Sequence, residues 1–157
     1  MSKTNDALLI NEGLKKNIFK MLTIAFEVSE CAEKNCSLQK KNIMADKKTA
    51  ALYTNFKGEQ DIKKKLKLGE QYSENDITYE YNKCLMKHCN KTLINLMKLY
   101  RSIISTIPES NPKRKKLDKI IDELELLVKK KQLNRNEYKI YLKNMAELMF
   151  IVKKQPT

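Results

Sequence analysis

Tryptophan is absent from this chain of 157 residues, and the chain has only three Gly, three Pro and one His. Because Gly and Pro interrupt regular structure more strongly than other residues, their scarcity favours long helices joined by short connections. The length suits one domain with a single modest core. The composition therefore predicts an all-α fold, with residues 1–157 forming a single helical domain.

Long hydrophobic runs are also missing. Apolar stretches such as Met21–Phe26 are far shorter than the roughly 20 residues that a helix needs to cross a bilayer. The start of the chain, Met1–Asp6, is polar, and Lys15 and Lys16 interrupt the apolar residues behind it, unlike a secretory signal. We expect cytoplasmic synthesis with no signal peptide and no membrane span, and a final site such as an assembly, a virus particle or the nucleus.

Catalytic motifs are absent as well. The single histidine, His88, has no nucleophile paired with it in the sequence, and Gly13, Gly58 and Gly69 stand too far apart to form a phosphate-binding loop. We therefore expect no enzyme, no small-molecule substrate and no cofactor.

The net charge is +13, and it is concentrated in two segments. Residues 34–67 hold ten Lys against three acidic residues, and residues 113–157 hold thirteen basic against six acidic residues. Only three of the 32 basic residues are Arg. Because Arg makes the bidentate contacts that read phosphate and guanine, this Lys bias favours diffuse attraction to anions over base readout. A Lys-rich and Asn-rich composition is also what an AT-rich genome encodes, so the charge has two explanations.

Two basic clusters are candidate anion-binding or partner-binding sites. The first is Lys63, Lys64 and Lys65, and the second is Lys113, Arg114, Lys115 and Lys116. The second cluster would fill the first turn of a helix, where positive charge is unfavourable unless an anionic partner is bound. For the first cluster, a solvated helix surface is the favoured explanation. For the second, solvation and partner contact explain the charges equally well, and a nuclear-import signal ranks below both.

One long amphipathic helix is predicted over Tyr72–Ile107. Ser73 can act as its N-cap, with Asp76 three residues further on. Apolar residues then recur at alternating steps of three and four, which places them on one helix face. These residues are Met86, Cys89, Leu93, Leu96, Tyr100, Ile103 and Ile107. A face of this length must be buried against other helices.

The first helix is predicted to begin near Thr4 or Asp6 and to end at about Asn35. Its apolar residues also recur at steps of three and four and so share one helix face. They are Leu14, Ile18, Met21, Ala25, Val28 and Ala32, and Leu22 and Phe26 stand beside this line. We expect it to pack antiparallel against the Tyr72–Ile107 helix, so that these two long helices form the core.

The C-terminal third is predicted to be a helical hairpin over residues 113–153, preceded by a possible hinge at residues 107–112. Asn111 can cap its first helix with Pro112 at the first position. Asn134 can cap its second helix together with Glu137. With a less regular helical segment over residues 37–69, the whole chain is predicted to be a bundle of four to five helices.

Four cysteines form two pairs with the same spacing, Cys31 with Cys36 and Cys84 with Cys89. Residues five apart in a helix lie too far apart for a disulfide within either pair. Antiparallel helices would instead bring Cys31 to Cys89 and Cys36 to Cys84, one of three connectivities. For a cytosolic chain, however, reduced core thiols are the first expectation, ahead of a double disulfide. A zinc site is a further alternative, to which His88 could contribute, although helical spacing turns the ligands apart.

Two classes of function are compatible with these features. The first is a non-enzymatic structural or interaction protein that joins other proteins in a larger assembly, such as a macromolecular complex or a virus particle. The second is a basic nucleic-acid-binding protein that uses the Lys-rich segments. Scarce Arg and the absence of interleaved aromatic and basic residues place nucleic acid second.

Overall fold

The computed structural model describes the backbone of residues 2–153 and the side chains of residues 16, 17 and 19–152. In this part of the chain all regular structure is α-helical, which confirms the all-α prediction, but there are eight helices rather than four or five. They are α1 (Ser2–Asn35), α2 (Ser37–Ala45), α3 (Lys47–Gly58), α4 (Ile62–Glu74), α5 (Asp76–His88), α6 (Asn90–Ser105), α7 (Pro112–Lys129) and α8 (Arg135–Lys153). Short connections join them, as expected from the scarcity of Gly and Pro.

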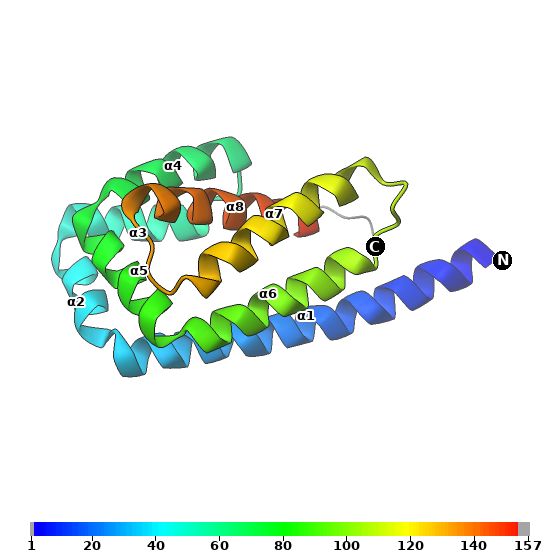
Figure 1. Cartoon of the computed structure of the whole chain (residues 1–157), viewed down its shortest axis with the longest axis horizontal. Helices are drawn as coiled ribbons and strands as arrows, with labels where there is room; N and C mark the ends of the chain where they lie inside the picture. The colour runs from blue at the N-terminus through cyan, green and yellow to red at the C-terminus, as the bar shows by residue number, and fades with distance from the viewer. Residues whose placement is uncertain (1, 154–157) are drawn as a thin grey trace.

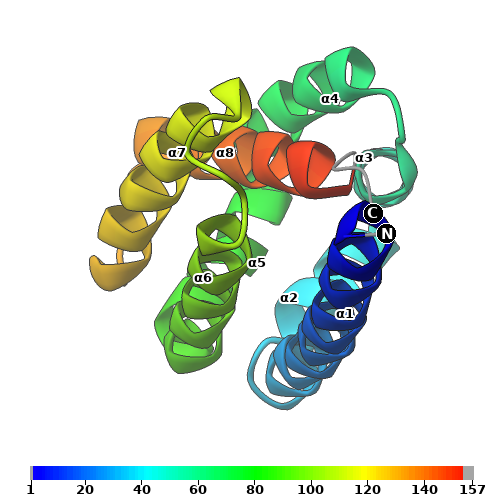
Figure 2. The ribbon, with the colours of Figure 1, turned by 90° about the vertical axis from the view of Figure 1, so that its right-hand side faces the viewer.

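α1 and α6 run side by side in opposite directions along the long axis of the molecule (Figure 1). α7 packs against α6, and α8 packs against both α7 and α4. α3 lies beside α4, and α2 contacts both α3 and α5 at the end of the molecule where α1 ends. Figure 2 shows α1 at the edge of this arrangement. One face of α1 therefore meets the other helices, and the opposite face does not.

The prediction of a single helix over Tyr72–Ile107 is wrong. The first interruption is at Asn75, which has extended backbone geometry and caps α5 by accepting hydrogen bonds from the N–H groups of Ile77 and Thr78 at 2.9 and 3.1 Å. Ser73, the predicted N-cap, is buried inside α4. An Asn cap satisfies the unpaired N–H groups at a helix start as well as a Ser cap does, so the sequence offered two competing start sites.

A second interruption falls at Cys89, between α5 and α6, where the backbone has φ −113° and ψ 19°. The apolar line across it is nevertheless buried. Most of the predicted face has an exposed fraction below one tenth, namely Met86, Cys89, Leu93, Tyr100, Ile103 and Ile107, whereas Leu96 is partly buried. The apolar periodicity therefore identified the buried face correctly and the helix boundaries incorrectly.

Two helix starts in the C-terminal third follow the sequence signals. The Asn111 side chain accepts a hydrogen bond from the N–H of Lys113 at 3.0 Å, with Pro112 as the first residue of α7. Asn134 accepts from the N–H of Glu137 at 2.8 Å, and the Glu137 carboxylate accepts from the N–H of Asn134 at 3.2 Å. This reciprocal pair is a capping box, as predicted.

The core lies mainly between α6, α7 and α8. Its fully buried apolar side chains include Met97, Ile104, Leu117, Ile121, Leu124, Val128 and Leu148. α1 contributes less: Met21, Val28 and Ala32 are only partly buried against this cluster. The predicted contributions of Leu14 and Ile18 fall outside the described side chains. Ala25, which was also expected on the inner face, is exposed.

Candidate functional site

The four cysteines join α1 and its junction with α2 to α5 and its junction with α6. Disulfides connect Cys31 to Cys89 and Cys36 to Cys84, with Cα atoms 5.9 and 6.0 Å apart. This is the connectivity that antiparallel helices would give. In each sequence pair one cysteine lies within a helix, and the other, Cys36 or Cys89, lies at a break between two helices.

These helix breaks have a geometric role. Residues five apart on a straight helix point about 140° away from each other, so both cysteines of a pair could not reach the same neighbouring helix. The non-helical backbone at Cys36 and Cys89 redirects the second cysteine of each pair. Cys36 and Cys89 are almost completely buried, whereas Cys31 is partly exposed. The breaks therefore allow two disulfides between the same pair of chain segments, which regular helices would prevent.

Oxidation of the cysteines bears on the two alternatives for this cluster. All four sulfur atoms are bonded in pairs, so in this state they are neither reduced core thiols nor thiolate ligands for zinc. Over the described residues, no three His, Cys, Asp or Glu side chains are grouped so that they could hold a metal ion.

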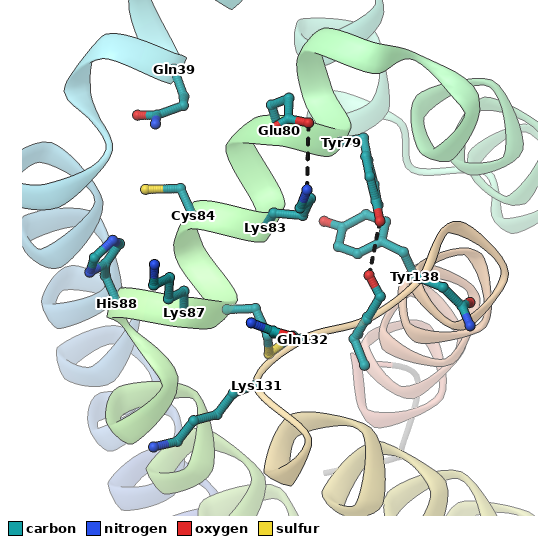
Figure 3. A pocket seen from close by; sticks show the side chains of 13 residues that line it. Gln39, Tyr79, Glu80, Lys83, Cys84, Lys87, His88, Lys131, Gln132 and Tyr138 are labelled. Carbon is teal, nitrogen blue, oxygen red and sulfur yellow. Dashed lines mark hydrogen bonds and ion pairs between the residues drawn. The ribbon is translucent and has the colours of Figure 1, made fainter.

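A pocket of about 690 Å³ opens beside the two disulfides (Figure 3). It lies between α5 and the connection from α7 to α8, and Gln39 of α2 closes one side. Its lining includes three lysines, Lys83, Lys87 and Lys131. Lys83 faces Glu80 at 3.6 Å, and the Lys87 and Lys131 side chains are exposed. Because lysines outnumber acidic residues in this lining, the pocket favours an anionic group. The charged side chains of the lining are all exposed, so none of them would hold such a group in a fixed position.

The inner wall of this pocket contains two tyrosines. Tyr79 donates its hydroxyl hydrogen bond to the carbonyl oxygen of Leu133 at 2.9 Å. The Tyr138 hydroxyl is buried and has no hydrogen-bond partner, and burial raises its pKa well above the usual value. His88, at the edge of the pocket, is exposed. Cys84 is disulfide-bonded, so this lining does not pair a free nucleophile with His88.

The first basic cluster lies at the start of α4. Lys63 and Lys64 are exposed, and Lys65 is partly buried with its ammonium group 5.4 Å from the centre of the Phe56 ring. Asp61 caps this helix by accepting hydrogen bonds from the N–H groups of Lys63 and Lys64. These backbone donors are therefore already used, and the helix start offers an anion mainly its lysine side chains.

The second basic cluster lies at the start of α7 and is partly structural. Arg114 donates a hydrogen bond to the carbonyl oxygen of Ile107 at 2.7 Å and faces Asp118 at 3.2 Å. Lys113 and Lys115 are exposed. Lys116 is also exposed, with its ammonium 3.9 Å from the Glu147 carboxylate. Arg114 thus ties the start of α7 to the end of α6, so it has a structural explanation that the sequence did not reveal.

The clearest exposed apolar surface lies on α1 and was not predicted. Phe19, Leu22 and Phe26 are exposed to 72%, 65% and 65%, and their spacing of three and four places them on one face of the helix. We call these three residues the outer face of α1. The sequence contained the signal, because two of them stand beside the predicted inner line. It did not show which apolar line the rest of the chain would cover.

Comparisons with known proteins do not assign this chain to a family. No protein-family model, no curated protein and no solved structure matches it. Over residues 2–153, none of the helices has the length and apolar character required to cross a membrane.

Proposed function

We propose that this chain is a non-enzymatic helical interaction protein that acts as a component of a larger assembly, such as a macromolecular complex or a virus particle. The observation that carries this proposal is the outer face of α1. Three adjacent large apolar side chains exposed on one helix are costly in water, and such patches typically mark contacts with other proteins.

The surroundings of α1 support the same proposal. The opposite face of the helix is occupied, since Met21, Val28 and Ala32 pack against the core. Two disulfides attach its C-terminal end to α5 and to the junction of α5 with α6. A helix fixed in this way loses little conformational freedom when it binds, which favours affinity. In this proposal, α1 lies antiparallel to α6 at the edge of the core, and α7 and α8 act as the C-terminal hairpin.

Mass measurement of the native complex tests this proposal. The protein is purified under non-denaturing conditions from the cells or particles that produce it. We expect a species heavier than the 18.4 kDa single chain, which persists between about 50 and 200 mM salt because apolar burial is not screened. Phe26→Glu should reduce the mass to that of a single chain. A wild-type protein that is a single chain in its native source would overturn the proposal.

Nucleic-acid binding is the second candidate, favoured by the exposed Lys63, Lys64, Lys113 and Lys115. Changing these four residues to Gln, while keeping Arg114 for its structural contacts, separates charge from folding. We expect weak duplex binding that falls steeply with salt, because each neutralised phosphate releases counterions. Tight duplex binding that is lost in the Gln variant, with assembly unaffected, would reverse the order of the two candidates.

A further inference from the structure

The two faces of α1 differ in how they are partnered. The inner face, with Met21, Val28 and Ala32, packs against the core of the same chain. At about 100° per residue, the middle of the outer face lies about 130° round the helix from the middle of the inner face. No helix of the described chain covers Phe19, Leu22 or Phe26, each of which is at least 65% exposed. A partner that covers this face therefore comes from outside the described residues.

The charges beside the outer face are arranged with opposite signs at its two ends. Lys16 is exposed on one flank of α1, near the N-terminal end of the outer face, and Glu30 is exposed on the same flank, near its C-terminal end. A helix that ran antiparallel along this face with the same sequence would present its Glu30 to Lys16 and its Lys16 to Glu30. The surface is therefore complementary to itself.

We infer that α1 pairs antiparallel with α1 of a second copy of this chain, so that the two outer faces form a two-fold symmetric contact. This inference rests on the proposed function and names the partner of that surface. Two-fold symmetry is the commonest arrangement of protein dimers, and it requires a self-complementary patch. Net charge alone would disfavour self-association of a chain with charge +13, but the net charge resides mainly outside α1.

The register of this contact follows from the positions of the charges. A two-fold axis that passes beside Thr23 places Lys16 level with Glu30 of the second copy. In an antiparallel pair, the same flank of both helices lies on one side of the contact, so these two charges meet. The symmetry makes this pair twice, once at each end of the contact.

The same register also fits the apolar side chains. Phe19 of one copy lies close to the height of Phe26 of the second copy, and the two Leu22 side chains lie on either side of the axis. The six apolar side chains can therefore alternate along the contact and cover one another. Because a single helix face is small for a protein interface, we expect a dimer of micromolar rather than nanomolar affinity.

Sedimentation of the full oxidised chain over a concentration series tests the inference. We expect the mass to rise from 18.4 kDa to twice that value by about 100 µM. Leu22→Glu places two carboxylates next to each other at the axis and should leave a single chain. Leu126→Glu is the matched control, because Leu126 on α7 is also 65% exposed. It should dimerise like the wild type.

Charge reversal tests the register. Lys16→Glu and Glu30→Lys should each raise the dissociation constant roughly tenfold, since each change breaks two symmetry-related pairs and creates repulsion. The double variant restores opposite charges across the contact, and it should return to within about threefold of the wild-type constant. Rescue by the second change cannot arise from a folding defect.

Three results would overturn the inference: a single chain for the wild type at about 100 µM, a dimer that Leu22→Glu leaves intact, or no rescue in the double variant. A single chain in isolation, combined with a heavier native complex that contains another protein and is lost in Phe26→Glu, would refute self-pairing while leaving the proposed function in place.

Discussion

The hydroxyl group of Tyr138 is the only buried side-chain polar atom of the described residues that has no hydrogen-bond partner. A buried hydroxyl loses its contacts with water, and without a new partner it destabilises the fold by about 1–3 kcal/mol. We predict that Tyr138→Phe leaves the free energy of unfolding unchanged or raises it by about 1 kcal/mol. Urea denaturation measures this difference. A loss of stability would mean that the hydroxyl has a partner in solution.

Several tyrosines link the stability of the fold to alkaline pH. Burial raises the pKa of Tyr81 and of Tyr100 to about 12, from an ordinary value of about 10. As the pH rises above 10, the unfolded chain therefore loses these protons before the folded chain does. Their contribution to stability is complete below pH 10 and decreases as the pH approaches and passes 12.

We predict that the free energy of unfolding falls between about pH 10 and 12, and that the buried tyrosines ionise together as the helices unfold. Parallel measurement of tyrosinate absorbance and helical circular dichroism follows both events. Tyr53 should ionise earlier. Burial raises its pKa, but hydrogen bonds from Lys40 and Lys57 and their charges outweigh this and leave the pKa below its ordinary value. Ionisation of all tyrosines near pH 10 with the helices intact would contradict the prediction.

Arg114 differs from its neighbours in the basic cluster because its side chain joins the start of α7 to Ile107 in the preceding connection and pairs with Asp118 within α7. Arg114→Gln removes the hydrogen bond to the Ile107 carbonyl and the pairing with Asp118, and we predict a loss of about 1–2 kcal/mol in the free energy of unfolding. Lys115→Gln, at an exposed neighbouring position, should change it by less than about 0.5 kcal/mol. Equal effects of the two changes in chemical denaturation would refute the structural role of Arg114.

At the scale of the helices, the two disulfides are nested, because the link between Cys36 and Cys84 lies inside the one between Cys31 and Cys89. They close separations of 48 and 58 residues, and each alone would stabilise the fold by about 4 kcal/mol through the entropy of the unfolded chain. When one is present, the other closes only a short loop and adds about 3 kcal/mol.

We therefore predict that replacing both cysteines of one disulfide by Ala costs about 3 kcal/mol, and that replacing all four costs about 7 kcal/mol. Denaturation of the three variants measures this. A four-cysteine variant that loses no more than the two pairwise losses combined would show that the nested geometry does not determine the stabilisation.

The sequence predicted those helix boundaries that depend on local signals. One helix start is marked by Asn111 and Pro112, and another by Asn134 and Glu137. Each signal lies within a few residues of the start that it marks, so both starts were predictable. The break at Cys89 has no Gly or Pro near it, and it serves a disulfide to a residue 58 positions away. Two cysteine pairs of equal spacing allowed this connectivity, but a chain with no secretion signal favoured reduced thiols over disulfides.

The candidate interaction surface was harder to predict than the buried face. Met21 and Phe26 belong to two apolar lines on the same helix, and helical periodicity detects both lines without showing which one other helices cover. The structure decides this through tertiary packing: α6 lies against the line that contains Met21. For Arg114, the spacing to Asp118 is a local signal, but the hydrogen bond to the Ile107 carbonyl depends on how the connection before α7 folds.

For the molecule as a whole, contacts across the predicted hinge favour one unit. Arg101 on α6 binds Asp122 and Glu125 on α7, and these ion pairs link the helices on either side of the connection at residues 106–111. Arg114 on α7 binds the carbonyl of Ile107 within this connection. These contacts support the proposal that residues 2–153 form a single domain without free motion at the hinge.

The nested disulfides also make the segment between Cys36 and Cys84 a closed covalent ring. A protease that cuts at the exposed Gln60, between α3 and α4, would open this ring without separating the two parts of the chain. We predict that a singly cleaved protein keeps its full mass on a non-reducing gel and yields two fragments only after reduction. Fragments that separate without reductant would contradict the ring. The protein can thus tolerate a backbone cut between α3 and α4 and remain one molecule that still carries the outer face of α1.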